Sequence, residues 1–223
     1  MTVPPSVLHT ITAELHVGML TLAAFCIILI VVTKLYLKIS RSLRWEFAVL
    51  GGLRARLNRL AEKIIEYAEP TSVVATLGGV IALVVSAYTG FLMAPAGTMV
   101  YSPLLMNKVM ISIFALEFWV ILLIIRAKYG RKIWNHSPLS MVYTVIGLTA
   151  FLFTVVSGSL GGHLAGKGSA LDPLYNLVGV NPENFFALGT FGIYALIGIC
   201  ILVGILFAYI YRKPKKVSFW CLS

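Results

Sequence analysis

The segment that decides the fold is VGMLTLAAFCIILIVVTKLYL, residues 17–37, in which Lys34 is the only charged residue. A helix needs roughly 20 mainly apolar residues to cross the hydrocarbon core of a bilayer. Four further segments meet this requirement, at about residues 72–93, 104–125, 139–160 and 186–209. The sequence therefore predicts an all-α protein, a five-helix transmembrane bundle that forms a single domain over residues 1–223.

The composition supports this interpretation. Of the 223 residues, 59% are hydrophobic and only 12% are charged, whereas a soluble domain carries about 25% charged residues. So apolar a chain needs lipid to cover its surface, and we expect a multi-pass protein of the cell membrane. The first ten residues, MTVPPSVLHT, lack a basic region, so no cleavable signal is expected.

The basic residues predict the orientation. Sixteen of the eighteen lie in three segments, residues 34–63, 126–132 and 212–216, which end the first span and follow it, separate the third span from the fourth, and follow the fifth. Loops rich in Lys and Arg remain in the cytoplasm, so we expect the N-terminus outside and the C-terminus in the cytoplasm. A net charge of +10 that faces anionic headgroups needs no nucleic acid to explain it.

Residues 38–70 connect the first two predicted spans on the cytoplasmic side. Within them, leucines recur at helical spacing with basic residues between them. This pattern is typical of an amphipathic helix. We expect a connector that lies on the membrane surface, with docking to a soluble partner as the alternative.

Three of the four histidines fall at the predicted outer end of the bundle. His16 begins the first span, His163 follows the fourth, and His9 lies two helical turns before His16. Two imidazoles from different helices at one depth can hold a b-type haem through its two axial positions. The alternatives are a copper or zinc ion at His16 and His163, and histidines that only solvate helix ends.

Two other features of the spans could carry function. Glu117 lies near the middle of the third span, where a carboxylate is costly and suggests a proton relay or a structural hydrogen bond. Gly158, Gly161 and Gly162 crowd the end of the fourth span. Glycines permit close helix packing, and a glycine surface would also let a porphyrin or quinone ring lie flat against the helix.

The same residues carry a resemblance to a known family. The chain resembles, over roughly residues 6–166, a family of small four-helix membrane proteins designated domain of unknown function 2231, which has cytochrome b-like character. His9 or His16, Gly90, and the run from Ser157 to His163 match its pattern. Leu105-Met106-Asn107-Lys108 stands where the family has a histidine, and the fifth span lies outside the pattern. The resemblance implies a haem ligated near the outer face.

These observations predict a membrane redox subunit that takes part in electron transport, such as a subunit of a respiratory complex. It would bind haem b through His16 and His163, with His9 as substitute, and exchange electrons with a quinone or a partner protein. A non-catalytic structural or assembly subunit of a larger membrane complex is the second hypothesis, and a small transporter or channel is the third. No nucleotide-binding, metalloprotease or Ser/His/Asp motif is present in the sequence.

Overall fold

The structure is a computed structural model that describes residues 4–42, 48–94, 102–179 and 181. All of them belong to one compact unit, Met1–Phe185. These residues form helices and no strand, which confirms the all-α prediction for the part of the chain that is described. The fifth predicted span, residues 186–209, lies outside the described residues.

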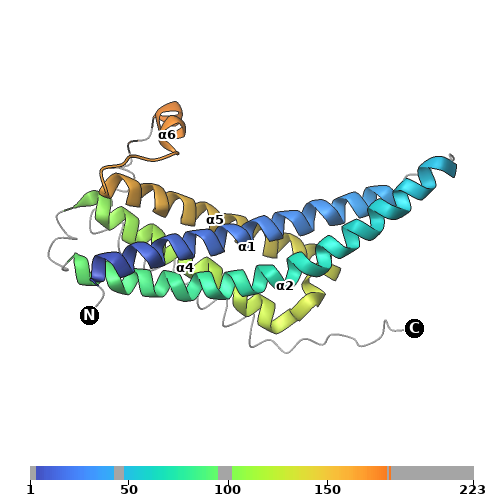
Figure 1. Cartoon of the computed structure of the whole chain (residues 1–223), viewed down its shortest axis with the longest axis horizontal. Helices are drawn as coiled ribbons and strands as arrows, with labels where there is room; N and C mark the ends of the chain where they lie inside the picture. Colours follow the sequence, from blue (N-terminus) through green and yellow to red (C-terminus); the bar gives the residue numbers. More distant parts are fainter. Residues whose placement is uncertain (1–3, 43–47, 95–101, 180, 182–223) are drawn as a thin grey trace. The chain divides into compact units, whose positions relative to one another are not determined.

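Four long helices make up the bundle (Figure 1), and each is long and apolar enough to cross a membrane. They are α1 (Pro5–Ser42), α2 (Ala48–Met93), α4 (Pro103–Tyr129) and α5 (Ser137–Leu164). A 3₁₀ turn, η1 (Gly130–Asn135), joins α4 to α5, and the short helix α6 (Asp172–Val178) follows α5. The observed helices include all four predicted spans in this region.

Local sequence explains where α4 begins and ends. The Ser102 hydroxyl accepts a hydrogen bond from the backbone N–H of Leu105, and Pro103 occupies the first turn, where its missing N–H costs nothing. At the other end Gly130 has a φ of 57°, a left-handed value that glycine adopts readily. The helix is therefore delimited by its own cap residues.

The helix boundaries differ from the predicted ones in two places. α1 begins at Pro5 rather than near residue 17. The polar side chains in its first turns bond to carbonyls of the same helix; for example, the Thr12 hydroxyl donates to the Leu8 carbonyl at 2.8 Å. α2 runs from Ala48 through Pro70 to Met93, so the predicted connector 38–70 is divided between the ends of α1 and α2. The connector is thus not a separate element.

Small residues let α1 and α2 pack closely. A Cβ atom on Gly79 of α2 would lie 2.5 Å from Leu20 Cδ2 and 3.3 Å from the Leu20 backbone nitrogen. Two turns further along α1, a Cβ atom on Gly147 of α5 would lie 3.0 Å from Ile27 Cδ1. In lipid, such close van der Waals contact is a main source of helix association.

One end of the bundle, which we call the basic end, holds a buried carboxylate. Glu69 of α2 is 4% exposed and forms ion pairs with Arg126 of α4 and, at 3.0 Å, with Arg131 of η1. Lys34 of α1 donates a hydrogen bond to the Trp134 carbonyl in η1. The basic end therefore connects α1, α2 and α4 to the turn before α5.

The outward faces of the helices are strongly apolar. Large side chains such as Phe25, Val74, Met141 and Leu152 are each more than half exposed. In water this surface would be costly, at about 25 cal/mol for each Å². Its extent along four helices is consistent with a lipid environment.

Close packing at Gly79 leads to a stability prediction. Gly79→Val should lower the unfolding free energy by about 1–3 kcal/mol, because the new side chain would overpack the contact with Leu20. Gly18→Val is the matched control, because a Cβ atom at Gly18 would meet nothing within 4 Å. Thermal unfolding in detergent, followed by circular dichroism, measures both. Equal unfolding midpoints for the two variants would contradict this account of α1–α2 packing.

Candidate functional site

The end of the bundle opposite the basic end, which we call the histidine end, holds three histidines. His9 packs from α1 onto α2. Its Nδ1–H donates to the Ser86 carbonyl at 2.9 Å, with Thr89 Oγ1 also near at 3.3 Å. A Cβ atom on Gly90 would lie 3.1 Å from the His9 ring, so glycine makes room for it. His9 therefore joins two helices, and its Nε2 atom keeps a lone pair.

His16 lies deeper, on the buried face of α1. It is 9% exposed, and its Nδ1–H donates to the Thr12 carbonyl at 3.1 Å. This bond favours the tautomer in which Nε2 is an acceptor. The depth of His16 follows from the contact between Ile27 of α1 and Gly147 of the antiparallel α5. His16 lies eleven residues before Ile27, and Gly158 lies eleven residues after Gly147. The His16 ring therefore lies near the level of Gly158.

α4 contributes two polar residues at this end. Asn107 is completely buried, and neither its amide nitrogen nor its amide oxygen has a hydrogen-bond partner among the described residues. Lys108 extends toward α5, where its Nζ atom would lie 3.3 Å from a Cβ atom on Gly161. Gly161 lies about one turn beyond Gly158, near whose level the His16 ring lies, so Lys108 and His16 both approach the end of α5. We call His16, Asn107 and Lys108 the histidine-end cluster.

The neighbours of this cluster have their hydrogen bonds satisfied. Ser112 and Ser157 bond to each other at 2.6 Å across α4 and α5. The Tyr175 hydroxyl of α6 donates to Ser159 at 3.0 Å. Buried polar groups in proteins are nearly always paired. The Asn107 amide, which has no partner in the described chain, is therefore an exception at this end of the bundle. The next residue, Lys108, has no acidic partner in the described chain.

His163, at the end of α5, is held by the loop that follows. Its Nε2–H donates to Asp172 Oδ1 at 2.8 Å, and the Ser169 backbone N–H donates to the other carboxylate oxygen at 2.9 Å. The bond from Ser169, with a smaller contribution from His163, holds the pKa of Asp172 below its usual value. The pair orders the loop between α5 and α6.

The described residues do not fit a haem held between His16 and His163. His163 already bonds to Asp172, and Lys108 covers Gly161. A Cβ atom on Gly162 would collide with the Gly168 carbonyl oxygen. Two of the three glycines expected to accept a flat ring are therefore covered, by an ammonium group and by the loop, and the third, Gly158, faces open space.

The remaining candidates are placed as follows. Glu117 is half-buried on α4, and its carboxylate has no hydrogen-bond or ion-pair partner within the described ranges. No group of three or more His, Cys, Asp or Glu side chains that could hold a metal ion occurs among these residues. The structure brings His16 near the end of α5, but it does not bring Glu117 into the histidine-end cluster.

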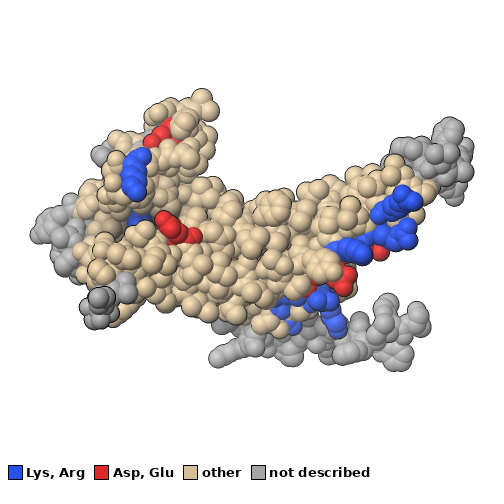
Figure 2. Space-filling model, in the orientation of Figure 1, with Lys and Arg blue, Asp and Glu red and all other residues tan. Residues whose placement is uncertain are grey.

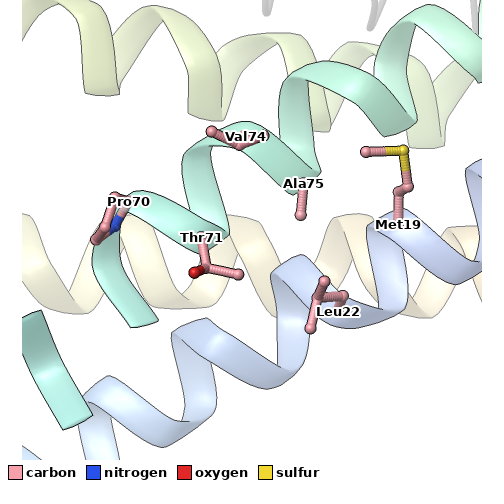
Figure 3. Close-up of a pocket in the computed structure, with 6 residues that line it drawn as sticks. All are labelled: Met19, Leu22, Pro70, Thr71, Val74 and Ala75. Carbon is pink, nitrogen blue, oxygen red and sulfur yellow. The ribbon is translucent and has the colours of Figure 1, made fainter. Parts of the chain in front are cut away.

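A shallow apolar groove lies between α1 and α2 (Figure 3). Six residues line it: Met19, Leu22, Pro70, Thr71, Val74 and Ala75. Its volume is about 320 Å³. Its one polar side chain, Thr71, donates to the Tyr67 carbonyl of its own helix at 2.8 Å. The groove therefore offers no free polar group to orient a ligand.

Sequence reasoning did not identify Asn107 and Lys108 as site residues. The signal was present, because both lie just inside an apolar span, where polar side chains are rare and often functional.

Comparisons of the chain with protein-family models, curated proteins and solved structures found no match.

The poor fit for haem gives a spectroscopic prediction. Protein purified from haem-replete cells should show no Soret band and no α/β bands after reduction with dithionite, because Lys108 and the loop fill the space beside Gly161 and Gly162. Absorbance spectra of the oxidised and reduced protein measure this. A stoichiometric six-coordinate haem spectrum that is lost in His16→Ala would show that this end of the bundle opens to admit the group.

Proposed function

We propose that this chain is a multi-pass membrane subunit that binds the head group of a quinone at the histidine-end cluster, and that it serves a redox assembly through that bound quinone. The observation that carries the proposal is the buried Asn107 amide, which has no hydrogen-bond partner among the described residues. The next residue in the sequence, Lys108, has no acidic partner within the same ranges. Leaving a buried polar group unsatisfied costs about 1–3 kcal/mol. A ligand that pairs these groups recovers that cost.

The chemistry of the cluster matches a quinone head group. Lys108 and the Asn107 amide nitrogen are donors, and each could donate to a carbonyl oxygen of a bound quinone. His16 Nε2 is an acceptor, so it could receive a hydrogen bond from the hydroxyl of the reduced quinol. One set of side chains thus supplies partners to both oxidation states of one ligand, and the apolar spans match its isoprenoid tail.

The structural or assembly hypothesis explains less. Such a subunit would need close helix packing and a stable ion network, both of which the bundle has at Gly79 and Glu69. It would gain nothing from a buried Asn107 amide that lacks a partner among the described residues. The quinone hypothesis gives that residue a purpose, so we favour it.

The central test is Asn107→Leu, which keeps the branched shape of the side chain and removes its polar atoms. Without ligand, the variant should be as stable as the parent or more so, because an unpaired polar group has been removed from the core. Its dissociation constant for decylubiquinone should rise at least about tenfold, equivalent to about 1.4 kcal/mol. Calorimetric titration in nanodiscs and thermal unfolding measure the two effects.

Controls separate the possible outcomes. Asn135→Leu, at an exposed position in η1, should leave binding unchanged. Laurate serves as a competitor, since its carboxylate could also pair with Lys108. Binding of laurate without decylubiquinone would identify an anion site instead, and binding of neither would leave Asn107 with a packing role only.

We also propose that the histidine end faces outward and the basic end faces the cytoplasm, as the distribution of basic residues indicates. In a background without accessible native cysteines, an impermeant maleimide added to intact cells should label Ala170→Cys but not Leu57→Cys. Ala170 lies in the loop after α5, and Leu57 lies on α2 near the basic end. The reverse labelling pattern would invert the topology.

A further inference from the structure

α1 and α2 continue together beyond the level of the α4–α5 turn. Lys34 marks that level on α1, because it bonds to Trp134 of η1, and Glu69 marks it on α2. Past these residues α1 runs on to Ser42, about 12 Å, and α2 runs back to Gly52, about 25 Å. Figure 1 shows this extension, which we call the stalk, residues 35–42 and 52–68.

Side-chain contacts hold the two halves of the stalk together. Ser40 of α1 donates to Asn58 of α2 at 3.1 Å and accepts from Arg54 at 3.1 Å. Arg41 and Glu62 form an ion pair at 3.6 Å. Because α2 is paired with α1 and continuous with its own spanning segment, the stalk follows the helix axes away from the bundle rather than lying flat on a bilayer.

The stalk carries an apolar stripe that nothing in the described chain covers. Leu53, Leu57 and Leu60 recur at spacings of four and three residues, which places them on one face of α2. They are 56%, 42% and 55% exposed. Within a span such exposure would face lipid, but here the residues lie beyond the level at which the other helices turn.

Charged residues beside the stripe indicate which kind of surface it can bind. Exposed Arg56, Arg59 and Lys63 lie along one flank, and Figure 2 shows Lys and Arg gathered over this end of α1 and α2. Glu62 and Glu66 lie about half a turn away from the leucines. A second copy of the chain would bring basic flank against basic flank, and like charges at an interface are unfavourable.

We propose that the leucine stripe and its basic flank bind a protein partner whose contact surface is apolar at the centre and acidic at the rim. This inference is independent of the quinone site. An apolar core with a polar, charge-complementary rim is the usual anatomy of a protein interface. The partner would approach from the side of the membrane at which the basic end lies.

Photo-crosslinking tests the proposal in cells that produce the full chain. The photoreactive residue p-benzoylphenylalanine is placed at Leu57, within the stripe, or at Glu66, on the far side, as the matched control. A protein should crosslink at position 57 and not at position 66. Crosslinking to a second copy, to no protein, or equally from both positions would overturn the proposal.

The captured protein is then identified by mass spectrometry, purified and titrated against the chain in nanodiscs. Leu57→Glu should weaken its binding at least about tenfold, and the Arg56→Gln, Arg59→Gln double variant should weaken it and flatten its salt dependence between about 50 and 500 mM. Both sites are exposed, so both variants should unfold at the parent temperature. Binding unaffected by these changes would sink the proposal.

A membrane surface is the competing occupant, and it is tested without any partner. A spin label at Leu57→Cys, in nanodiscs that contain phosphatidylglycerol, should be relaxed more strongly by a water-soluble nickel reagent than by oxygen. The opposite ranking would place the stripe in lipid and rule out the protein interface.

Discussion

The ion pairs of Glu69 with Arg126 and Arg131 are the constraint on which the arrangement of the helices depends. Helices in lipid are not driven together by the hydrophobic effect, so directional polar contacts have a large part in setting their register. Removing one partner of a buried ion pair costs about 3–5 kcal/mol. Glu69 therefore fixes α2 against the α4–α5 turn, and Lys34 ties α1 to the same turn. The contacts of Gly79 with Leu20 and of Gly90 with His9 then hold α1 and α2 together along their length.

The two ends of the bundle use polar residues differently. At the basic end the buried charge of Glu69 is matched by two guanidinium groups. At the histidine end Asn107 and Lys108 have no comparable partners in the described residues. Burial of polar groups is costly at both ends, but among the described residues only the basic end places opposite charges against the buried group. This asymmetry separates a structural polar cluster from one suited to a ligand.

Sequence reasoning found the spans from composition alone but misplaced their ends. The second predicted span begins near residue 72, just after Pro70, and proline removes one backbone bond from a helix. α2 nevertheless continues, with the Ser72 hydroxyl donating to the Glu69 carbonyl at 2.7 Å and the Thr71 hydroxyl to the Tyr67 carbonyl. Neither bond reaches the Glu66 carbonyl, which is the one that Pro70 leaves without a backbone donor. Asn107 was missed for a different reason: its lack of partners depends on residues far away in the chain, which no local pattern reveals.

Pro70 also has a mechanical consequence. A helix bends most easily where one rung of its hydrogen-bond ladder is missing, and in α2 that rung is the bond that the Glu66 carbonyl would otherwise accept from residue 70. The close contact of Gly79 with Leu20 stiffens the segment on one side of this joint, whereas the stalk on the other side is held only by α1. Sideways force on the α2 half of the stalk is thus absorbed near Pro70, whereas force on the α1 half is passed along the unbroken α1, the helix that carries His16.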